Sequence, residues 1–593
     1  MTVQPANTIW RDFVTDGVPA SGQWAPHKAD IRAWGTSLEG PRTKSYATRT
    51  ALRAATPVAN DAAVLCESGR SGVFVFSASN LSSLVSADTQ EGLYIAPTSD
   101  TTGASGAWVR QRDSLDVFVK WFGALGDGTT DDITPINKAI LALPVIGGRV
   151  IFDALTYRTS GPIIIGDGTS STFSTRYGVS LVGANVPIDP PVWSAYPQAT
   201  GTKIKIDNVT GAIVDVRGPL RGWGVSNMVL QGNALTNYGI KAMSAGFGRV
   251  ENVSIYSCQS DGVHLNCYST ASFAPTTQNV NTERVHFQNV FIFNGGSSGC
   301  AGVRLAGASD GTSSTCFCSF DTLDIVMGTA SVQQYGVYLA VADTNIFTNA
   351  HIYGTSHATS VAVVADYSFN ATFPSANYFF GLDPALQGGL AFATNGTPGP
   401  NSKLNRVYGC SDLNGPTILS LGFAADMQVS RTSLASDFAG QNVATAQPVF
   451  APAQDTFNLK AGTLYRFKGL YIIARGAGTT SHTTSLLWGG TATFTSFDAL
   501  AKVSNGDAGT LGAVVDKEIT VATGTVVTAA NTSATESVKV MIEGEMRVNA
   551  AGTFIPQFQY SAAPGGAPAI RRGSFFEIWP IGPAAFTSNG EAT

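Results

Sequence analysis

Charged residues are scarce in this sequence, and positive charge is nowhere clustered. Asp, Glu, Lys and Arg make up only 13% of the 593 residues and hydrophobic residues make up 44%, a balance that excludes a disordered chain. The formal net charge is −5, and no basic run exceeds the pair Arg571 and Arg572. Because proteins that bind the phosphate backbone need grouped lysines and arginines, we expect no nucleic-acid partner.

Cysteine is also sparse. The seven cysteines are an odd number without compact spacing, so they indicate neither a disulfide framework nor a zinc site. We expect reduced, mostly buried thiols, and we predict no metal ion and no other cofactor.

Long apolar runs and a targeting segment are missing as well. No stretch approaches the roughly 18 apolar residues that span a bilayer. The N-terminal segment MTVQPANTIWRDFVTDG has no basic stretch followed by an apolar one. We therefore expect no membrane insertion and no signal peptide, and synthesis in a cytoplasm.

Glycine, in contrast, is abundant. The 64 glycines, together with many Ser, Thr and Asn residues, are typical of short strands joined by turns and predict a mainly β protein. A chain of 593 residues is too long for one ordinary core, so several domains are expected. The residue patterns divide it at 1–113, 114–445 and 446–593.

The first segment, 1–113, predicts a small α+β module. A short helix is expected at 26–39, with Ile31, Trp34 and Leu38 on one face, and strands are expected at 73–77 and 92–96. The last segment, 446–593, predicts an antiparallel β-sandwich. Its alternating or apolar runs at 465–473, 539–549 and 574–579 are separated by glycine-rich turns.

The middle segment, 114–445, begins with a predicted amphipathic helix at about 131–143. Asp131 or Asp132 can cap it, and its apolar face contains Ile136, Ile140 and Leu143. Short β runs bounded by turn residues follow at 149–152 and 161–165.

A degenerate repeat follows the helix. The pattern Gly, β-branched, any residue, apolar starts at Gly239, Gly262, Gly302 and Gly336, at spacings of about 23 to 40 residues. Between these copies lie strand pairs with a common frame, namely VENVSI, FQNVFI, FDTLDI and FTNAHI. Since one rung of a β-helix needs about the lower spacing and loops absorb the excess, the repeat predicts a solenoid of stacked parallel turns.

Several of these stretches resemble phage tail proteins. RDFVTDGVPASG, HKADIRAWG and TSDTTGASGAWVRQ resemble the N-terminal modules of phage tail fibres and tailspikes. VKWFGALGDGTTDDITPINKAILAL with GGRVIFDALTYRTSGPIII resembles the start of the pectate-lyase-like β-helix domains of tailspikes, except that 153–155 replace the usual Pro-Gly turn. NAAGTFIPQFQYSAAPGGAP resembles the C-terminal domains of phage fibres.

The resemblance implies a right-handed parallel β-helix in a homotrimer on the virion tail. It further implies that the N-terminal module attaches to phage tail or baseplate proteins, and that the β-helix recognises a bacterial surface polysaccharide such as capsule, exopolysaccharide or O-antigen. The C-terminal sandwich is expected to hold the trimer together, to contact sugars, or both.

Paired carboxyl groups are the residues that glycoside hydrolysis needs, one as acid and one as base or nucleophile. The strand-pair frame predicts two outward stripes, one of Glu251, Gln288, Asp321 and Thr348 and one of Ser254, Phe291, Asp324 and His351. Glu283 precedes the second strand pair, an arrangement that resembles tailspike endoglycosidases with a Glu on one rung and Asp-x-x-Asp on the next. We predict Glu283 or Asp321 as general acid and Asp324 or Asp321 as base in an inverting reaction. The alternative is that these acids are solvated at a strand bend.

A second stripe contains His264, Arg304 and Tyr338, the variable positions of the glycine repeat. A cation and a base on one face suit a polysaccharide lyase, while the simpler interpretation is a polar outer surface. We predict Glu251, His264, Arg304, Tyr338 and His351 as substrate-binding residues. Asp127, Asp131 and Asp132 are interpreted as turn and cap residues.

The preferred function is depolymerisation of a bacterial surface polysaccharide by an endoglycosidase. A lyase is the second choice, and a tail fibre that binds its receptor without catalysis is the alternative, because β-helices host both kinds of function.

Overall fold

The computed structural model describes most of the chain. The residues described are 27–39, 44–186, 201–207, 210–233, 235, 237–273, 279–294, 296–328, 332–354, 357, 359–386, 390–396, 405–409, 423–426, 430–452, 454–507, 510–519 and 524–583. The motif at 11–22 and the cysteine at 410 lie outside them.

The N-terminal unit is a small α+β module, as predicted. The helix expected at 26–39 is α3 (Lys28–Glu39). A five-stranded sheet of order β1-β2-β3-β5-β4 carries a core that includes Leu52, Phe74 and Trp108. Its elements are β1 (Lys44–Tyr46), α4 (Arg49–Arg53), β2 (Ala62–Leu65), β3 (Gly72–Ser77), α5 (Ser82–Ala87), β4 (Tyr94–Ile95) and β5 (Ala107–Arg110).

The capping helix is α6 (Ile133–Leu141), which buries Ile136, Ala139 and Ile140. Of the two predicted cap residues, Asp132 makes no side-chain cap hydrogen bond to the helix and instead accepts from the amides of Leu125 and Gly126. Asp131 accepts from the amide of Ile133. A buried carboxylate must be hydrogen-bonded, and the amides of the turn before the helix satisfy Asp132. Asp131 is therefore the residue that bonds to the first turn of the helix.

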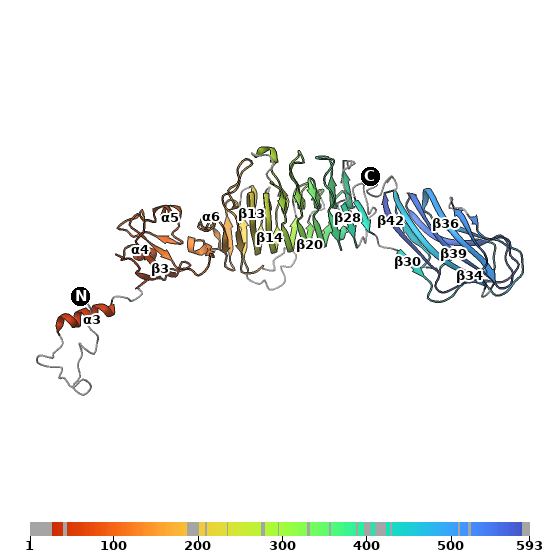
Figure 1. Ribbon diagram of the computed structural model, residues 1–593, viewed down its shortest axis with the longest axis horizontal. Coiled ribbons are helices and arrows are strands. Elements are labelled where there is room, and N and C mark those ends of the chain that lie inside the picture. Colours follow the sequence, from red (N-terminus) through yellow and green to blue (C-terminus); the bar gives the residue numbers. More distant parts are fainter. Residues whose placement is uncertain are drawn as a thin grey trace, which may run out of the picture.

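The middle segment coils as a parallel β-helix, which confirms the predicted fold. One 21-stranded sheet winds from β6 to β29, and all its strand pairs are parallel, so each turn lies in register on the next (Figure 1). The 3-10 helices η2 (Val119–Phe122) and η3 (Thr270–Ser272) interrupt it. Its strands are β6 (Val117–Phe118), β7 (Asp127–Asp131), β8 (Gly148–Ile151), β9 (Thr156–Thr159), β10 (Ile163–Ile165), β11 (Val179–Val182), β12 (Lys203–Ile206), β13 (Gly211–Gln231), β14 (Asn237–Tyr256), β15 (Val263–Asn266), β17 (His286–Asn294), β18 (Ala301–Leu305), β20 (Ser319–Met327), β21 (Tyr335–Leu339), β23 (Ile346–Gly354), β24 (Val361–Asp366), β25 (Tyr378–Phe380), β26 (Asp383–Leu386), β27 (Leu390–Asn395), β28 (Asn405–Tyr408) and β29 (Phe423–Asp426).

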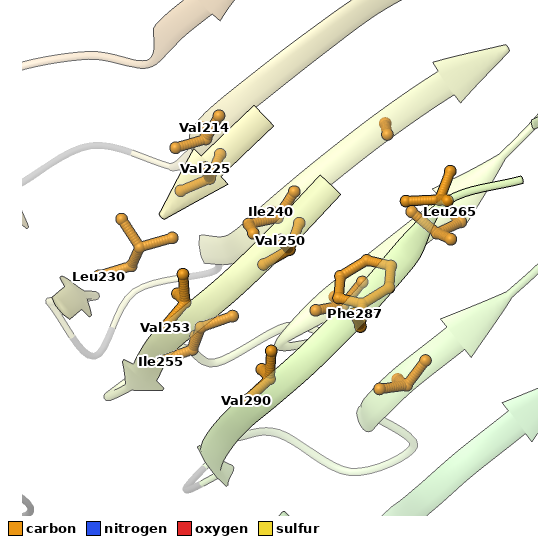
Figure 2. Packing of buried hydrophobic residues seen from close by; sticks show 14 of the residues in the cluster. Val214, Val225, Leu230, Ile240, Val250, Val253, Ile255, Leu265, Phe287 and Val290 are labelled. Atoms are coloured by element: carbon orange, nitrogen blue, oxygen red, sulfur yellow. The ribbon is translucent and has the colours of Figure 1, made fainter. Parts of the chain in front are cut away.

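Inward side chains of successive turns stack into one core. Figure 2 shows Val250 and Phe287 projecting to the same side from consecutive turns. The rings of Phe287, Phe320, Phe347 and Phe379 stack at centroid distances of 4.6, 4.5 and 4.7 Å. Such ladders hold the register of the turns, because a slip of one residue would expose them.

The glycine of the repeat has a steric role. A Cβ atom built on Gly302 would lie 2.5 Å from Cγ2 of Ile325, and one on Gly262 would lie 2.5 Å from Cγ2 of Ile292. These isoleucines are the last residues of the strand-pair motifs, so the two halves of the sequence pattern pack directly against each other. The repeat therefore marks a close approach between two walls of the coil.

Two kinds of corner bend each turn. One is a column of residues with positive φ on consecutive turns, which includes Asn252 (51°), Asn289 (52°) and Thr322 (54°). In this column the side-chain amide of Asn289 donates to Asn252 at 2.8 Å, and that of Asn252 donates to Asn227 at 3.0 Å. The other, here called the corner column, consists of Phe247, Arg284, Phe317 and Thr344, with φ of 52–54°. Between the two corners runs one outer wall of the coil.

A short three-stranded parallel sheet precedes the corner column. It consists of β16 (Thr282–Glu283), β19 (Thr315–Cys316) and β22 (Ala342–Asp343). Each of its strands ends directly before a residue of the corner column.

The C-terminal unit is an antiparallel β-sandwich, as predicted. Two groups of strands enclose one core that includes Phe467, Trp488 and Phe554. The sandwich begins before the predicted boundary at 446, because β30 and β31 already pair with its strands β42 and β41. Its strands are β30 (Ser430–Ser433), β31 (Phe438–Ala439), β32 (Gln447–Pro448), β33 (Phe457–Leu459), β34 (Thr463–Arg475), β35 (Thr484–Gly489), β36 (Thr493–Asp507), β37 (Val514–Ile519), β38 (Thr525–Val526), β39 (Glu536–Ala550), β40 (Gly552–Tyr560), β41 (Pro568–Ile570) and β42 (Phe575–Pro583).

Candidate active site

The predicted outward stripes exist in the predicted register. Glu251, Gln288, Asp321 and Thr348 are partners on consecutive turns, and so are Ser254, Phe291, Asp324 and His351. Phe320, Leu323 and Ile325, the neighbours of Asp321 and Asp324 along the strand, are buried in the core, so the two acids point outward.

Corners of the coil lie between Asp321, Asp324 and Glu283. The corner at Thr322 separates Asp321 from Asp324, so the two acids stand on different walls of the coil. The corner at Phe317 separates Asp321 from Cys316, the register partner of Glu283. Acids that are close in sequence can therefore lie on different walls when a corner falls between them.

The acids of the two stripes differ in their partners. Asp324 lies 3.0 Å from Nδ1 of His351, and both side chains are partly exposed. Glu251 forms an ion pair with Arg249. Within the part of the chain that the structure describes, Asp321 has no hydrogen bond or ion pair.

Glu283 occupies a different environment, since its side chain is only 8% exposed. Its carboxylate lies 3.5 Å from Nη2 of Arg221 and 3.5 Å from Nη1 of Arg284, and the amide of Asn279 is also 3.5 Å away. All these contacts are at the long limit of hydrogen bonding. A nearly buried carboxylate held only by long contacts retains the capacity to bind a ligand.

Asp343 stands in the same row as Glu283, and the sequence analysis missed it. Glu283 pairs with Cys316, and Cys316 pairs with Asp343, so one turn lies between the two acids. Ala342, the neighbour of Asp343, belongs to the core, so the row Glu283, Cys316 and Asp343 points away from that core, although Glu283 and Cys316 are only 6% and 2% exposed as whole residues. We call these three residues the carboxyl row.

The spacing of the carboxyl row follows from sheet geometry. Adjacent strands are about 4.8 Å apart, which puts the backbones of Glu283 and Asp343 about 9.6 Å apart. Burial raises the pKa of the intervening Cys316 thiol to about 12, and the charges of Glu283 and Asp343 contribute to the rise. Cys316 is therefore a neutral spacer between two acids.

Exposed aromatic rings flank the carboxyl row. Phe247 and Phe317 are 49% and 50% exposed, although both are large apolar side chains. The guanidinium carbon of Arg284 lies 5.4 Å from the centre of the Phe247 ring and 5.7 Å from that of Phe317. The corner column thus presents two rings with a cation between them, next to two carboxyl groups.

A signal for the missed residues is present in the sequence. Extending the strand-pair frame upstream aligns TERVHF, TCFCSF and ADTNIF, which puts Glu283, Cys316 and Asp343 in one column and Arg284, Phe317 and Thr344 in the next. The motifs VENVSI, FQNVFI, FDTLDI and FTNAHI begin after this corner, so they contain neither of these two columns of residues.

The stripe of His264, Arg304 and Tyr338 is also in register, but its polar groups already have hydrogen-bond partners within the protein. Asp261 lies 2.7 Å from His264 and 2.9 Å from Arg304, and it accepts from the amide of Ala301 at 2.8 Å. Arg304 stacks over the Tyr338 ring at 4.1 Å. This cluster resembles a structural network more than an open binding surface.

Burial acts to raise the pKa of Asp261, but the hydrogen bond from His264 and the charge of Arg304 outweigh it, so that this pKa lies below its ordinary value. The hydroxyl of Tyr338 donates to Asp366, which occupies the polar end of that ring.

Among the described residues, no three His, Cys, Asp or Glu side chains are grouped as metal ligands. None of the helices in the described ranges has the length and apolar character to cross a membrane.

Known proteins that are similar to this chain include phage tailspikes, at low sequence identity. No protein-family model matches it. Among solved structures it is similar to a tailspike from the Acinetobacter baumannii bacteriophage Fri1, described as a capsular polysaccharide depolymerase, with 14% identity and a TM-score of 0.37 over 89% of this chain and 100% of that one. It is also similar to the tailspike of Acinetobacter baumannii phage AM24, with 12% identity and a TM-score of 0.35 over 89% of this chain and 94% of that one.

One curated protein is similar over a short stretch. A mannuronan C5-epimerase of Azotobacter vinelandii is 34% identical over 126 residues, which are 20% of this chain. The chain spans about 6% of the length of that relative.

Proposed function

We propose that this chain binds a bacterial surface polysaccharide and cleaves it by endo-glycoside hydrolysis at the carboxyl row. The observation that carries the proposal is Glu283, a nearly buried carboxylate whose contacts are all 3.5 Å long, in one outward row with Asp343. With the backbones about 9.6 Å apart, side chains that lean toward each other would bring the two carboxyl groups within the roughly 6.5–9.5 Å of inverting enzymes, which leaves room for water.

The charges near each acid support a division of roles. Arg221 and Arg284 put positive charge beside Glu283, which suits a carboxylate that activates water as base. Asp343 has no ion pair among the described residues, and its neighbour Thr344 donates to it at 2.8 Å, so we assign it the acid role. Glu283 thereby keeps its predicted place in the site but takes the role of base.

In this scheme, Asp343 gives its proton to the glycosidic oxygen as the bond breaks. Glu283 takes a proton from the water that attacks the opposite face of the sugar. Both groups are on strands of a stacked sheet, which holds their separation constant. Phe247 and Phe317 offer apolar surface beside the reacting sugar.

The experiment is incubation with capsule, exopolysaccharide and O-antigen preparations, followed by mass analysis and assay of reducing ends. We expect Glu283→Gln and Asp343→Asn each to lower the cleavage rate at least 100-fold, in line with the usual contribution of a catalytic acid or base. Asp321→Asn and Asp324→Asn are the matched controls, because they remove the same charge from other walls of the coil. Loss of activity in those controls, with activity retained in Glu283→Gln and Asp343→Asn, would return the site to the acids first predicted.

Two other functions are distinguished by the same incubation. New ultraviolet absorption from unsaturated uronate ends would indicate a lyase, although Arg304 is already paired with Asp261. Tight binding without new ends after long incubation would indicate a receptor-binding fibre without catalysis.

We also propose that the chain works as a homotrimer on a virion tail, attached to tail or baseplate proteins by its N-terminal unit. The support is the resemblance of its terminal segments to phage fibre modules, together with an apolar area on the outer face of the C-terminal sheet. This area includes Leu470, Leu500, Met541 and Phe575.

A further inference from the structure

Two arginines at the carboxyl row lack close carboxylate partners. Among the described residues, the polar contacts of Arg221 are 3.2 to 3.5 Å long, to the carbonyls of Leu220, Asn279 and Asn281 and to Glu283. The contact of Arg284 to Glu283 is 3.5 Å. Together they bring two positive charges to one carboxylate.

Other arginines of this chain are bound more tightly. Arg149 lies 2.6 Å from Asp116, Arg158 lies 2.6 Å from Asp207, and Arg571 lies 2.7 Å from Asp437. Close pairing is therefore common on this surface. At Glu283, the carbonyls of Leu220, Asn279 and Asn281 take most donors of Arg221, whereas the long contact to Glu283 leaves donors of Arg284 available.

The backbone holds Arg284 outward. It occupies a corner with φ of 52°, a conformation that a residue with a Cβ atom adopts at an energetic cost, and its side chain is 52% exposed. The rings of Phe247 and Phe317 limit its movement from both sides. An exposed guanidinium at this corner has the donors that can bind a carboxylate through two parallel hydrogen bonds.

We infer that the polysaccharide is acidic and that Arg284, supported by Arg221, binds the carboxylate of a uronic acid unit beside the cleaved bond. Arg221 reaches the site because Gly246, its register partner on the next turn, has no side chain, and a Cβ there would lie 2.9 Å from Nη1 of Arg221. This inference rests on the proposed polysaccharide site and names its substrate class.

The probe is a panel of purified bacterial polysaccharides, some containing uronic acid and some neutral, tested for binding to the full chain carrying Asp343→Asn. Each polysaccharide that binds is tested again after its carboxyl groups are reduced to alcohols. We expect the bound members to contain uronic acid, and carboxyl reduction to weaken binding at least 10-fold. Added salt should weaken binding to the native form more than to the reduced form.

Arg284→Gln should lower affinity for the native polysaccharide about 10-fold and leave affinity for the reduced form unchanged. Arg249→Gln is the matched control, because it removes the same charge from the neighbouring wall, where Arg249 pairs with Glu251. It should bind both forms like its parent.

Three outcomes overturn the inference: preferential binding of neutral polysaccharides, binding unchanged by carboxyl reduction, or equal losses of Arg284→Gln on both forms. Cleavage is measured separately with chains that retain Asp343. Binding that depends on Arg284 without any cleavage would refute the hydrolytic function and leave the acidic ligand standing, whereas cleavage of a neutral polysaccharide would do the opposite.

Discussion

Asp261 and Glu283 are both nearly buried carboxylates, yet their surroundings give them different tasks. Asp261 has short contacts of 2.7 to 2.9 Å to His264, Arg304 and an amide. Glu283 has only contacts of 3.5 Å. Short hydrogen bonds satisfy Asp261, as is usual for a structural residue, whereas Glu283 keeps unused hydrogen-bonding capacity, on which its proposed role depends.

Asp261→Asn should destabilise the protein by roughly 3–5 kcal/mol at neutral pH, because Arg304 and His264 would lose a buried partner. The pKa of Asp261 is lower in the folded chain than in the unfolded chain, so its stabilising effect is present above about pH 4 and is lost as the pH falls through the folded value. Denaturant unfolding at several pH values should show the difference between wild type and variant shrinking in acid. Asp321→Asn is the control and should change stability by less than about 0.5 kcal/mol. A difference that persists undiminished in acid would contradict this account.

The thiols allow a second test at this scale. Burial raises the pKa of Cys258 and Cys316 to about 12 and that of Cys267 to about 11, so few thiolates exist there at pH 8. Cys66 is exposed. In a background with the cysteine at 410 changed to serine, a thiol reagent should label Cys66 in the native protein and the buried thiols only after unfolding. Rapid native labelling of the buried thiols would show that the coil opens.

At the scale of the element, the glycine repeat sets how closely the walls of the coil approach. Gly302→Ala should cost about 1–3 kcal/mol, the usual range for overpacking, because the new methyl group meets Cγ2 of Ile325 at 2.5 Å. Combining it with Ile325→Leu, which removes that branch, should restore part of the loss. Gly161→Ala is the control, since a Cβ there meets nothing within 4 Å. Thermal unfolding measures all four chains, and equal effects of both alanines would refute the steric explanation.

At the scale of the whole molecule, the three units follow one another along a single long axis (Figure 1). The N-terminal unit is fastened to the coil, since the guanidinium of Arg110 lies 4.4 Å from the ring centre of Trp121 and Arg70 donates to the Trp121 carbonyl at 2.6 Å. These contacts fix the orientation of the N-terminal unit relative to the coil.

The proposed trimer predicts a solution mass three times that of the 61.7 kDa chain. Met541 is 62% exposed and Leu500 is 41% exposed on the outer face of the C-terminal sheet, so Met541→Glu should weaken assembly by placing a charge in an apolar contact. Val58→Glu changes an equally exposed residue, at 67%, in the N-terminal unit and should leave the mass unchanged. Light scattering after size exclusion measures both. A monomeric wild type would refute the trimer, and a trimeric Met541→Glu would place its interface elsewhere.

The sequence by itself determined the coil and its register. Gly302 and its counterparts recur because a Cβ would clash, and Phe287 and Phe320 recur because inward rings stack, so both leave a periodic signal in the residues. The sequence also identified Glu283 as a candidate. Steric and packing requirements repeat once per turn, and a repeat is visible without coordinates.

Only the tertiary structure decided which acids meet. The corners at Phe317 and Thr322 turn Asp321 and Asp324 onto separate walls, while stacking brings Asp343 into line with Glu283 across 60 positions of sequence that contain loops of unequal length. It also decided that the carboxylate of Asp261 has short hydrogen bonds, whereas that of Glu283 has long ones. Bend direction and hydrogen-bond distance depend on contacts between turns, and those contacts exist only once the chain has coiled.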